Sequence, residues 1–131
     1  MHLSKGTTYA VHGLMALAGM KASGPVQLKE VASARGLPGN YLAKIFGQLA
    51  RAKILRSYRG ARRGFMFARP IQQITLLDVY EAVEGPMEPG DSLIENKKGG
   101  KATDSKFYKR WDRALKAISK ELSSISLKDL V

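Results

Sequence analysis

Apolar residues recur at helical spacing from the start of the chain. Tyr9, Leu14 and Leu17 fall on one side of a helix, and Ser4 is a suitable N-cap before them. The pattern therefore predicts an amphipathic first helix over residues 4–21. The run Ser23-Gly24-Pro25 ends it, because glycine and proline interrupt helical backbone.

Two further helical segments follow, separated by the short turn Gly36-Leu37-Pro38-Gly39. The first is short, and the second carries apolar residues on one side and basic or amide residues on the other. This arrangement is typical of a helix-turn-helix, although an ordinary helical hairpin has the same pattern. The apolar positions are Leu28, Val31 and Ala32 in the first segment and Tyr41, Leu42, Ile45, Phe46 and Leu49 in the second.

The next residues predict a β-hairpin, with strands over 54–59 and 65–68 and a turn over 60–64. A helix-turn-helix followed by a hairpin is a winged helix. Arg59, Arg62 and Arg63 gather at its tip beside glycines, and arginine is suited to a narrow, negative minor groove of DNA. A basic hairpin that serves solubility alone is the alternative.

A fourth helix is predicted from a capping box of Thr75 and Asp78 to the stop at Gly85-Pro86. A last long helix starts at Asp104. Its apolar residues are spaced by four, three, four and three, as in a coiled-coil seam, so it needs a partner surface: a second copy or its own domain. The seam residues are Trp111, Leu115, Ile118, Leu122 and Ile125.

These elements indicate a mainly α fold: a winged helix-turn-helix with a small hairpin wing and a long C-terminal dimerisation helix. We expect a DNA-binding domain over residues 1–85, a flexible loop over 86–103, and a dimerisation helix with its tail over 104–131.

Charge separates the two halves of the chain. Residues 1–70 hold twelve Lys or Arg and one acidic residue, whereas residues 71–131 hold ten of each, so the whole formal charge of +11 lies in the first half. Such a field suits a nucleic acid, because cations that neutralise phosphates release condensed counterions. A solvated basic face has the same composition.

Composition excludes several classes of function. The chain has no cysteine, which removes disulfides, thiolate metal sites and cysteine nucleophiles. It also lacks the phosphate-binding GxxxxGK[ST] and dinucleotide GxGxxG motifs, so we do not expect an enzyme. The apolar stretch from Tyr9 to Met20 is too short and too broken for a membrane span or signal peptide, and we expect a soluble, cytoplasmic protein.

Several motifs together resemble the Rrf-two family of bacterial winged-helix transcription regulators, which includes iron–sulfur cluster regulators, nitric-oxide-sensing repressors and cysteine-metabolism repressors. The likeness extends over nearly the whole chain. It is carried by Leu3-Ser4 with Tyr9-Ala10-Val11, by Asn40-Tyr41-Leu42, by Ser57-Tyr58-Arg59-Gly60, and by Ile74-Thr75-Leu76 with Glu84-Gly85-Pro86.

The resemblance implies a homodimer that places Asn40 and Tyr41 in the major groove and Arg59 in the minor groove. The family wing usually runs Arg-Gly-x-x-Gly-Gly-Tyr, whereas Arg63 and Phe65 here replace a glycine and the tyrosine. The tip geometry and preferred operator are therefore expected to differ. Ala43 stands where some relatives have an acidic residue facing the groove, which could broaden the sequence preference.

Cluster-sensing relatives carry three cysteines before the long helix, and the matching region Ser92–Ser105 has none, so we expect no iron–sulfur cluster and no other cofactor. Asp91, Glu95 and Asp104 offer oxygen ligands for a hard cation, with solvated loop charges as the alternative. Neither His2 nor His12 has companion ligands nearby in the sequence, so both are interpreted as structural.

The sequence thus predicts a homodimeric, sequence-specific DNA-binding regulator, and the family default is repression. A regulator that works mainly through a protein partner and a winged helix that binds structured RNA are the alternatives. The expected base contacts are Asn40, Tyr41 and Gln48, the expected phosphate contacts are Lys44, Arg51, Lys53 and Arg56, and the expected minor-groove contacts are Arg59, Arg62 and Arg63.

Overall fold

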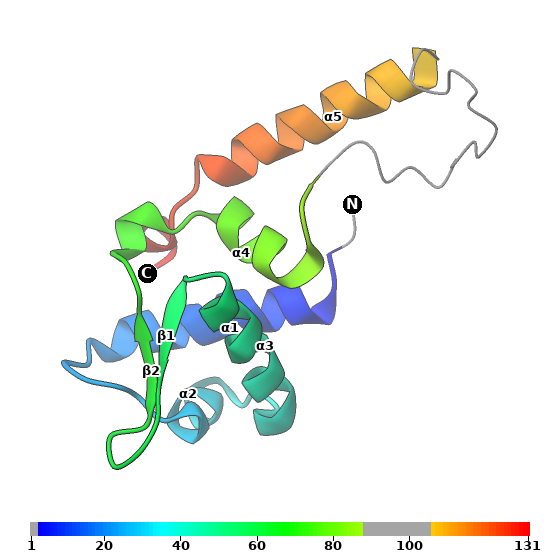
Figure 1. The fold of residues 1–131 in the computed structure, drawn as a ribbon. Coiled ribbons are helices and arrows are strands. Elements are labelled where there is room, and N and C mark those ends of the chain that lie inside the picture. The colour runs from blue at the N-terminus through cyan, green and yellow to red at the C-terminus, as the bar shows by residue number, and fades with distance from the viewer. Residues whose placement is uncertain (1–2, 88–105) are drawn as a thin grey trace.

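The computed structural model describes residues 3–87 and 106–131 (Figure 1). These residues form a mainly helical fold with one antiparallel hairpin, and the predicted fold class is confirmed. The helices are α1 (Lys5–Met20), α2 (Leu28–Arg35), α3 (Gly39–Arg51), α4 (Leu76–Glu84) and α5 (Lys106–Ser123); the strands are β1 (Leu55–Tyr58) and β2 (Gly64–Phe67); and short 3₁₀ helices span Ile71–Gln73 and Leu127–Leu130.

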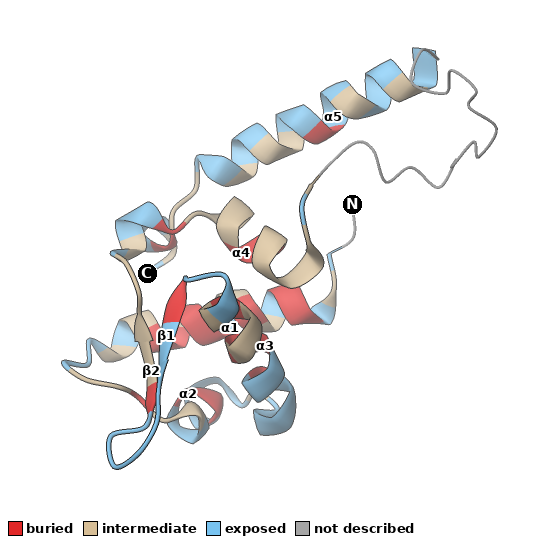
Figure 2. Cartoon of the chain, viewed as in Figure 1, coloured by how far each residue is buried: buried red, intermediate tan, exposed pale blue. Residues whose placement is uncertain are grey.

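Helix α1 has the ends that its sequence predicts, to within one residue. The hydroxyl oxygen of Ser4 accepts a hydrogen bond from the Thr7 N–H at 3.4 Å, which satisfies one free donor of the first turn. At the other end, Lys21 takes a left-handed conformation with φ 47° and closes the helix. One side of α1, which includes Ala10, Leu14 and Leu17, is buried (Figure 2).

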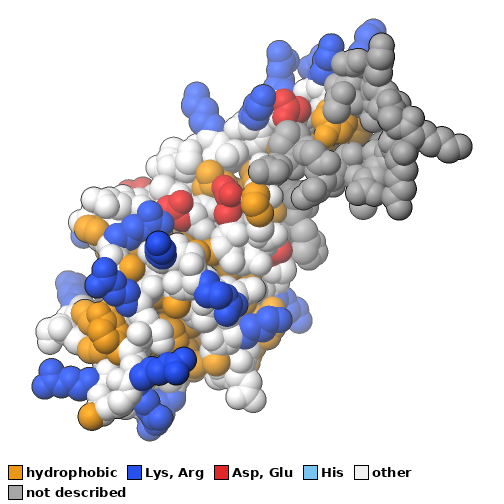
Figure 3. All heavy atoms as spheres, in the orientation of Figure 1, with side chains coloured by type: hydrophobic (Ala, Val, Ile, Leu, Met, Phe, Trp, Pro, Cys, Tyr) orange, Lys and Arg blue, Asp and Glu red, His pale blue; other side chains and the backbone are white. Residues whose placement is uncertain are grey.

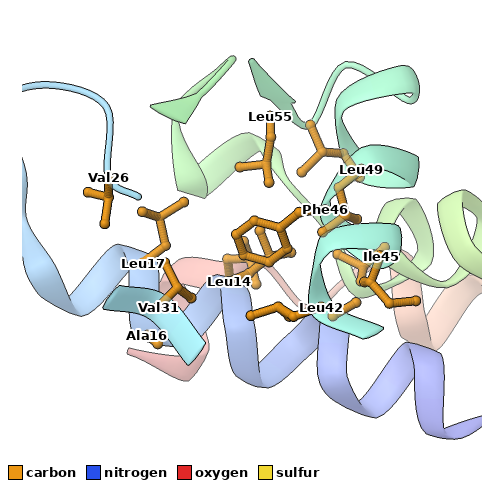
Figure 4. Close-up of a cluster of buried hydrophobic side chains, with 14 of the residues drawn as sticks. Leu14, Ala16, Leu17, Val26, Val31, Leu42, Ile45, Phe46, Leu49 and Leu55 are labelled. Atoms are coloured by element: carbon orange, nitrogen blue, oxygen red, sulfur yellow. The ribbon is translucent and has the colours of Figure 1, made fainter. Parts of the chain in front are cut away.

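The hydrophobic core lies between α1, α3 and the hairpin (Figure 4). Leu14 and Phe46 are completely buried in it. The two helices pack closely because position 13 is glycine: a Cβ there would lie 2.8 Å from Cε1 of Phe46. The Phe46 ring meets the Phe65 ring edge to face at 5.2 Å, so the core also links α3 to the wing.

The hairpin pairs Leu55 with Phe67 and Tyr58 with Gly64, and residues 59–63 form its tip. Strand β1 is one residue shorter at each end than predicted, and β2 has the predicted length but begins one residue earlier. The segment before α2 adds a contact that the sequence did not indicate. Val26 and Phe65 exchange two backbone hydrogen bonds, at 3.0 and 2.9 Å, and thereby fasten the tip-side half of β2 to the segment that leads into α2.

The capping box predicted at the start of α4 is present. The Thr75 hydroxyl accepts from the Asp78 N–H at 3.1 Å, and the Asp78 carboxylate accepts from the Thr75 N–H at 2.9 Å. Helix α4 ends at Glu84, one residue before the predicted stop. Except for Pro86 and Met87, the loop predicted over 86–103 lies outside the described residues.

Helix α5 lies over α4, and the chain then returns to the main body (Figure 1). The prediction that α5 extends through Ile125 is wrong, because the helix ends at Ser123. The Ile125 carbonyl instead accepts from the Leu76 N–H at 2.9 Å. Two residues later, Leu127 is completely buried in the core, so the C-terminal tail shares the hydrophobic core of the helix-turn-helix.

Candidate nucleic-acid interface

One face of α3 is buried and the other faces solvent. Leu42, Ile45, Phe46 and Leu49 point into the core, which leaves the opposite side of the helix for a partner. The predicted contact residues Asn40, Lys44 and Arg51 are exposed on that side.

Gln48 is less available than its neighbours. It is half-buried, and its Oε1 atom is enclosed without a hydrogen-bond partner among residues 3–87 and 106–131. Burial of an amide oxygen costs free energy unless a donor forms a hydrogen bond with it. The predicted base contact by Gln48 stays a prediction, and it would require the side chain to turn outward.

Tyr41 is shared between α3 and α1. Its ring meets the Tyr9 ring edge to face at 5.3 Å, and 38% of the residue remains exposed. Its hydroxyl oxygen lies against the first turn of α1, only 3.2 Å from where a Cβ on Gly6 would be. The first turn of α1 therefore supports the side chain that the sequence assigns to base reading.

The tip of the wing presents three exposed guanidinium groups, those of Arg59, Arg62 and Arg63. None of them pairs with a carboxylate within the described parts of the chain. Gly60 turns the tip with φ 89°, and Gly64 closes it with φ 147°, both values that favour glycine. These charges are held outward by a tight turn and remain available to an anionic partner.

A hollow of about 460 Å³ lies between the starts of α2 and α3 and the wing. We call it the reading cleft. It brings Asn40 from α3 together with Arg63 from the wing, and Lys29 from α2 adds a cation that sequence reasoning did not single out. The sequence signal for Lys29 was only its place in the first turn of α2.

A second, basic hollow of about 850 Å³ lies beside β1, on the C-terminal half of α3. Arg51, Lys53, Arg56 and Arg69 line it. Arg69 pairs with Asp78 at 3.2 Å, whereas the other three have no ion-pair partner among the described residues. Figure 3 shows Lys and Arg side chains over the lower part of the molecule, where no Asp or Glu side chain is in view. The structure thus gathers three of the predicted phosphate contacts at one place.

Lys53 adds a backbone feature to this basic hollow. It joins α3 to β1 in a left-handed conformation, with φ 62°, which is uncommon for a residue other than glycine. The conformation lets the Ile54 N–H donate to the Leu49 carbonyl at 3.0 Å and ends α3 sharply. Lysine at this position places a cation where glycine would be less strained.

The predicted seam of α5 is only partly open to a partner. Leu115 is 6% exposed and is covered by its own chain, and Ile118 and Leu122 are half-buried. Trp111 is 44% exposed and Phe107 is 64% exposed, and their rings stack with centroids 6.2 Å apart. An exposed pair of large aromatic rings is unusual on a surface that faces only water.

The described residues contain no group of three His, Cys, Asp or Glu side chains that could hold a metal ion. Of the two histidines, only His12 is described, and its Nδ1 lies 3.3 Å from Arg35 Nη1 at the surface. His2, Asp91, Glu95 and Asp104 lie outside the described residues. No helix in residues 3–87 and 106–131 is long and apolar enough to cross a membrane.

A helix-turn-helix beside a basic hairpin, with both elements open to an anionic partner, defines a winged-helix DNA-binding transcription regulator. The model of the Rrf2 family, described as an iron-dependent transcriptional regulator, matches residues 3–131, and the chain belongs to this family. The predicted family is therefore confirmed, and the protein is a transcription regulator and not an enzyme.

Named relatives agree with this assignment. A Synechocystis sp. protein that is named as an HTH-type transcriptional regulator is 33% identical over 99% of this chain and 87% of its own length. The regulator CymR of Bacillus subtilis is 28% identical over 99% of this chain and 89% of its own length. IscR of Xenorhabdus nematophila is 27% identical over the whole chain and 79% of its own length.

Solved structures show the same fold. The structure of CymR, the global cysteine regulator of B. subtilis, superposes with a TM-score of 0.78, covering 99% of this chain and 95% of that one at 29% identity. That of T. potens IscR gives a TM-score of 0.77, covering 99% and 85% at 29% identity.

The family description names iron, and the side chains of this protein do not suit an iron–sulfur cluster. Such clusters are held by thiolates, and the sequence contains no cysteine. We therefore assign no step of its action to a cluster.

Proposed function

We propose that this protein is a homodimeric repressor that recognises its operator by sequence and acts without an iron–sulfur cluster. The reading cleft carries the proposal. Asn40, at the start of α3, and Arg63, in the wing, both line it, so one surface can contact a major groove and the adjacent minor groove at the same time.

The residues of α3 have distinct parts in this proposal. The Asn40 amide can donate to and accept from one adenine edge in the major groove, which is a contact that distinguishes bases. Lys44 and Arg51 lie further along the exposed side of the helix and suit phosphate groups, which fix orientation but carry no sequence information. Tyr41 supplies an apolar edge beside Asn40.

The wing reads DNA shape. Arg59, Arg62 and Arg63 are exposed on a tip that two glycines keep narrow, and arginine is favoured where a minor groove is narrow and its potential most negative. The extra positive charge of Arg63, in place of the family glycine, supports a preference for A·T-rich steps at this position.

Pairing of two copies through α5 would cover the exposed Phe107 and Trp111 rings. A two-fold dimer also presents two wings and two copies of α3, which matches half-sites about one helical turn apart. Occupation of a promoter by such a dimer would repress transcription. As a regulator of bacterial type it would act in the cytoplasm.

A protein partner is the second candidate for the aromatic pair. If the protein acts without a cofactor, as predicted, its DNA binding must be regulated by something other than a cluster. The stacked Phe107 and Trp111 rings form a surface that a partner protein could bind. In that case the rings would be covered by the partner and not by a second copy.

The proposed function is tested by binding of the purified protein to its own upstream DNA, to a scrambled duplex of equal length and to a structured RNA. Fluorescence anisotropy at low and moderate salt separates attraction to phosphates from base reading. We expect the upstream DNA to be preferred at moderate salt. Equal affinities that collapse together with salt would contradict sequence-specific regulation, and preference for the RNA would favour the RNA-binding alternative.

A further inference from the structure

The first turn of α1 lacks the negative charge that helix N-termini favour. It contains no acidic residue and instead begins with Lys5, whereas α2 has Glu30 and α4 has Asp78 in the first turn. The free N–H groups and the positive end of the helix dipole are stabilised by an anion. The sequence near α1 does not supply one.

Glu84, about eighty residues away in the chain, supplies that charge. Its Oε1 accepts from the Ser4 backbone N–H at 3.1 Å, from the Ser4 hydroxyl, and from the Thr7 hydroxyl at 2.8 Å. Thr7 is only 5% exposed, so its hydroxyl is held within the protein. Hydrogen bonds to a carboxylate are among the stronger ones that proteins form.

The position of Glu84 in its own helix is unfavourable. It is the last residue of α4, where the helix dipole favours a cation, and Gly85 then turns the chain away with φ 93°. A residue that opposes its local preference is explained by the contacts it makes elsewhere. Here they include the hydrogen bonds with Ser4 and Thr7 at the start of α1.

The same turn of α1 also touches the reading end of α3. A Cβ on Gly6 would lie 3.1 Å from Cδ1 of Ile45 and 3.2 Å from the Tyr41 hydroxyl oxygen, so glycine permits a close approach of the two helices. One turn later, Tyr9 packs edge to face against Tyr41. Glu84 therefore holds one side of a helical turn whose other side supports Tyr41.

We propose that Glu84 is a positioning residue for DNA recognition: its carboxylate fixes the first turn of α1 and thereby orients the start of α3 for base reading. This inference rests on the proposed function. The end of α4 touches no base in the proposed complex. Under this inference it nevertheless contributes to sequence preference and not only to stability.

The experiment compares Glu84→Gln with Glu81→Gln, a matched removal of one carboxylate from the same helix. Affinities for the operator duplex and for the scrambled duplex are measured separately. We expect Glu84→Gln to lower the preference for the operator by about five- to tenfold, the size of a typical coupling between sites, while affinity for the scrambled duplex stays unchanged. Glu81→Gln should change neither affinity.

A merely structural role would give another result. Loss of a structural contact lowers the unfolding midpoint and so reduces the folded fraction of the protein. The apparent affinities for the operator duplex and for the scrambled duplex then fall by the same factor, and the preference is retained. If Glu84→Gln keeps the full operator preference of the parent, the inference is overturned. If the parent itself shows no preference, the proposed function fails first and the inference fails with it.

Thr7→Val provides a milder second variant that removes one hydroxyl donor to Glu84 and nearly conserves the side-chain volume. It should also lower operator preference, and the double variant with Glu84→Gln should lose little more than Glu84→Gln alone, because both changes act on the same interaction: one removes its donor and the other removes the charge of its acceptor. If the fold-losses of operator preference in the two single variants multiply in the double variant, Thr7 and Glu84 act separately. That result would overturn the proposed link.

Discussion

A Cβ atom on Gly64 would lie 2.4 Å from the carbonyl oxygen of Val26, a separation that real side chains do not tolerate. Gly64 pairs with Tyr58 at the tip end of the hairpin, and its φ of 147° is one that other residues rarely adopt. Next to it, Phe65 exchanges hydrogen bonds with Val26. The missing side chain of Gly64 therefore allows the wing to attach to the segment before α2.

Gly64→Ala is expected to destabilise the protein by about 3 kcal/mol, because the added methyl group meets backbone that cannot move without breaking the Val26–Phe65 pair. Gly60→Ala is the matched control, since position 60 also has positive φ but open space around it. It should cost about 1 kcal/mol. Urea unfolding of both variants measures the difference, and equal costs would show that contact with Val26 is unimportant.

Arg59→Ala is expected to weaken operator binding about 10- to 100-fold, the usual size of one specific groove contact. The fold should be unaffected, because Arg59 is exposed on the wing and has no ion-pair partner in the described structure. Lys109→Ala removes one exposed charge from α5 and serves as the control. An operator affinity equal to that of the parent would remove the wing from the mechanism.

Local signals in the sequence predicted most of the fold. The Ser4 cap of α1 and the capping box of Thr75 and Asp78 are interactions between residues three apart, so the sequence shows both partners together. The hairpin was found for the same reason, because Gly60 and Gly64 mark its turn.

Contacts between distant residues could not be predicted in this way. Val26 joins Phe65, and Glu84 reaches Ser4, through pairings that no local pattern encodes. The seam of α5 shows a further limit. Its periodicity identified an apolar side but not what covers it, and the structure buries Leu115 within its own chain while Trp111 stays open.

Trp111→Glu is expected to shift the protein from dimer to monomer, because a carboxylate cannot be buried at an apolar interface without a partner. The monomer should keep its helical content, since Trp111 is 44% exposed within the single chain. Light scattering coupled to gel filtration gives the mass, and circular dichroism gives the helix content. Lys109→Glu is the control on the same helix. A parent that is already monomeric would contradict the proposed dimer and favour a partner protein at this surface.

Leu127→Ala is expected to destabilise the whole domain by about 3 kcal/mol, as for other fully buried leucines. Its N–H donates to the Ile74 carbonyl at 2.8 Å, so the tail is also tied by backbone. Leu130→Ala, at a half-buried position three residues on, should cost less. Thermal unfolding checks both, and a negligible effect of Leu127→Ala would mean that the tail is not part of the cooperative unit.

The basic hollow beside β1 predicts a measurable salt effect. If Arg51 and Arg56 each neutralise one phosphate, replacing both by Gln should reduce the slope of log K against log salt by about 1.8, at roughly 0.9 per phosphate. The preference for operator over scrambled DNA should change little, because phosphates carry no sequence information. Lys109→Gln with Lys116→Gln removes two charges from α5 as a control. An unchanged slope in the Arg51 and Arg56 variant would place this hollow away from the bound duplex, whereas a loss of preference would show that one of its arginines reads bases.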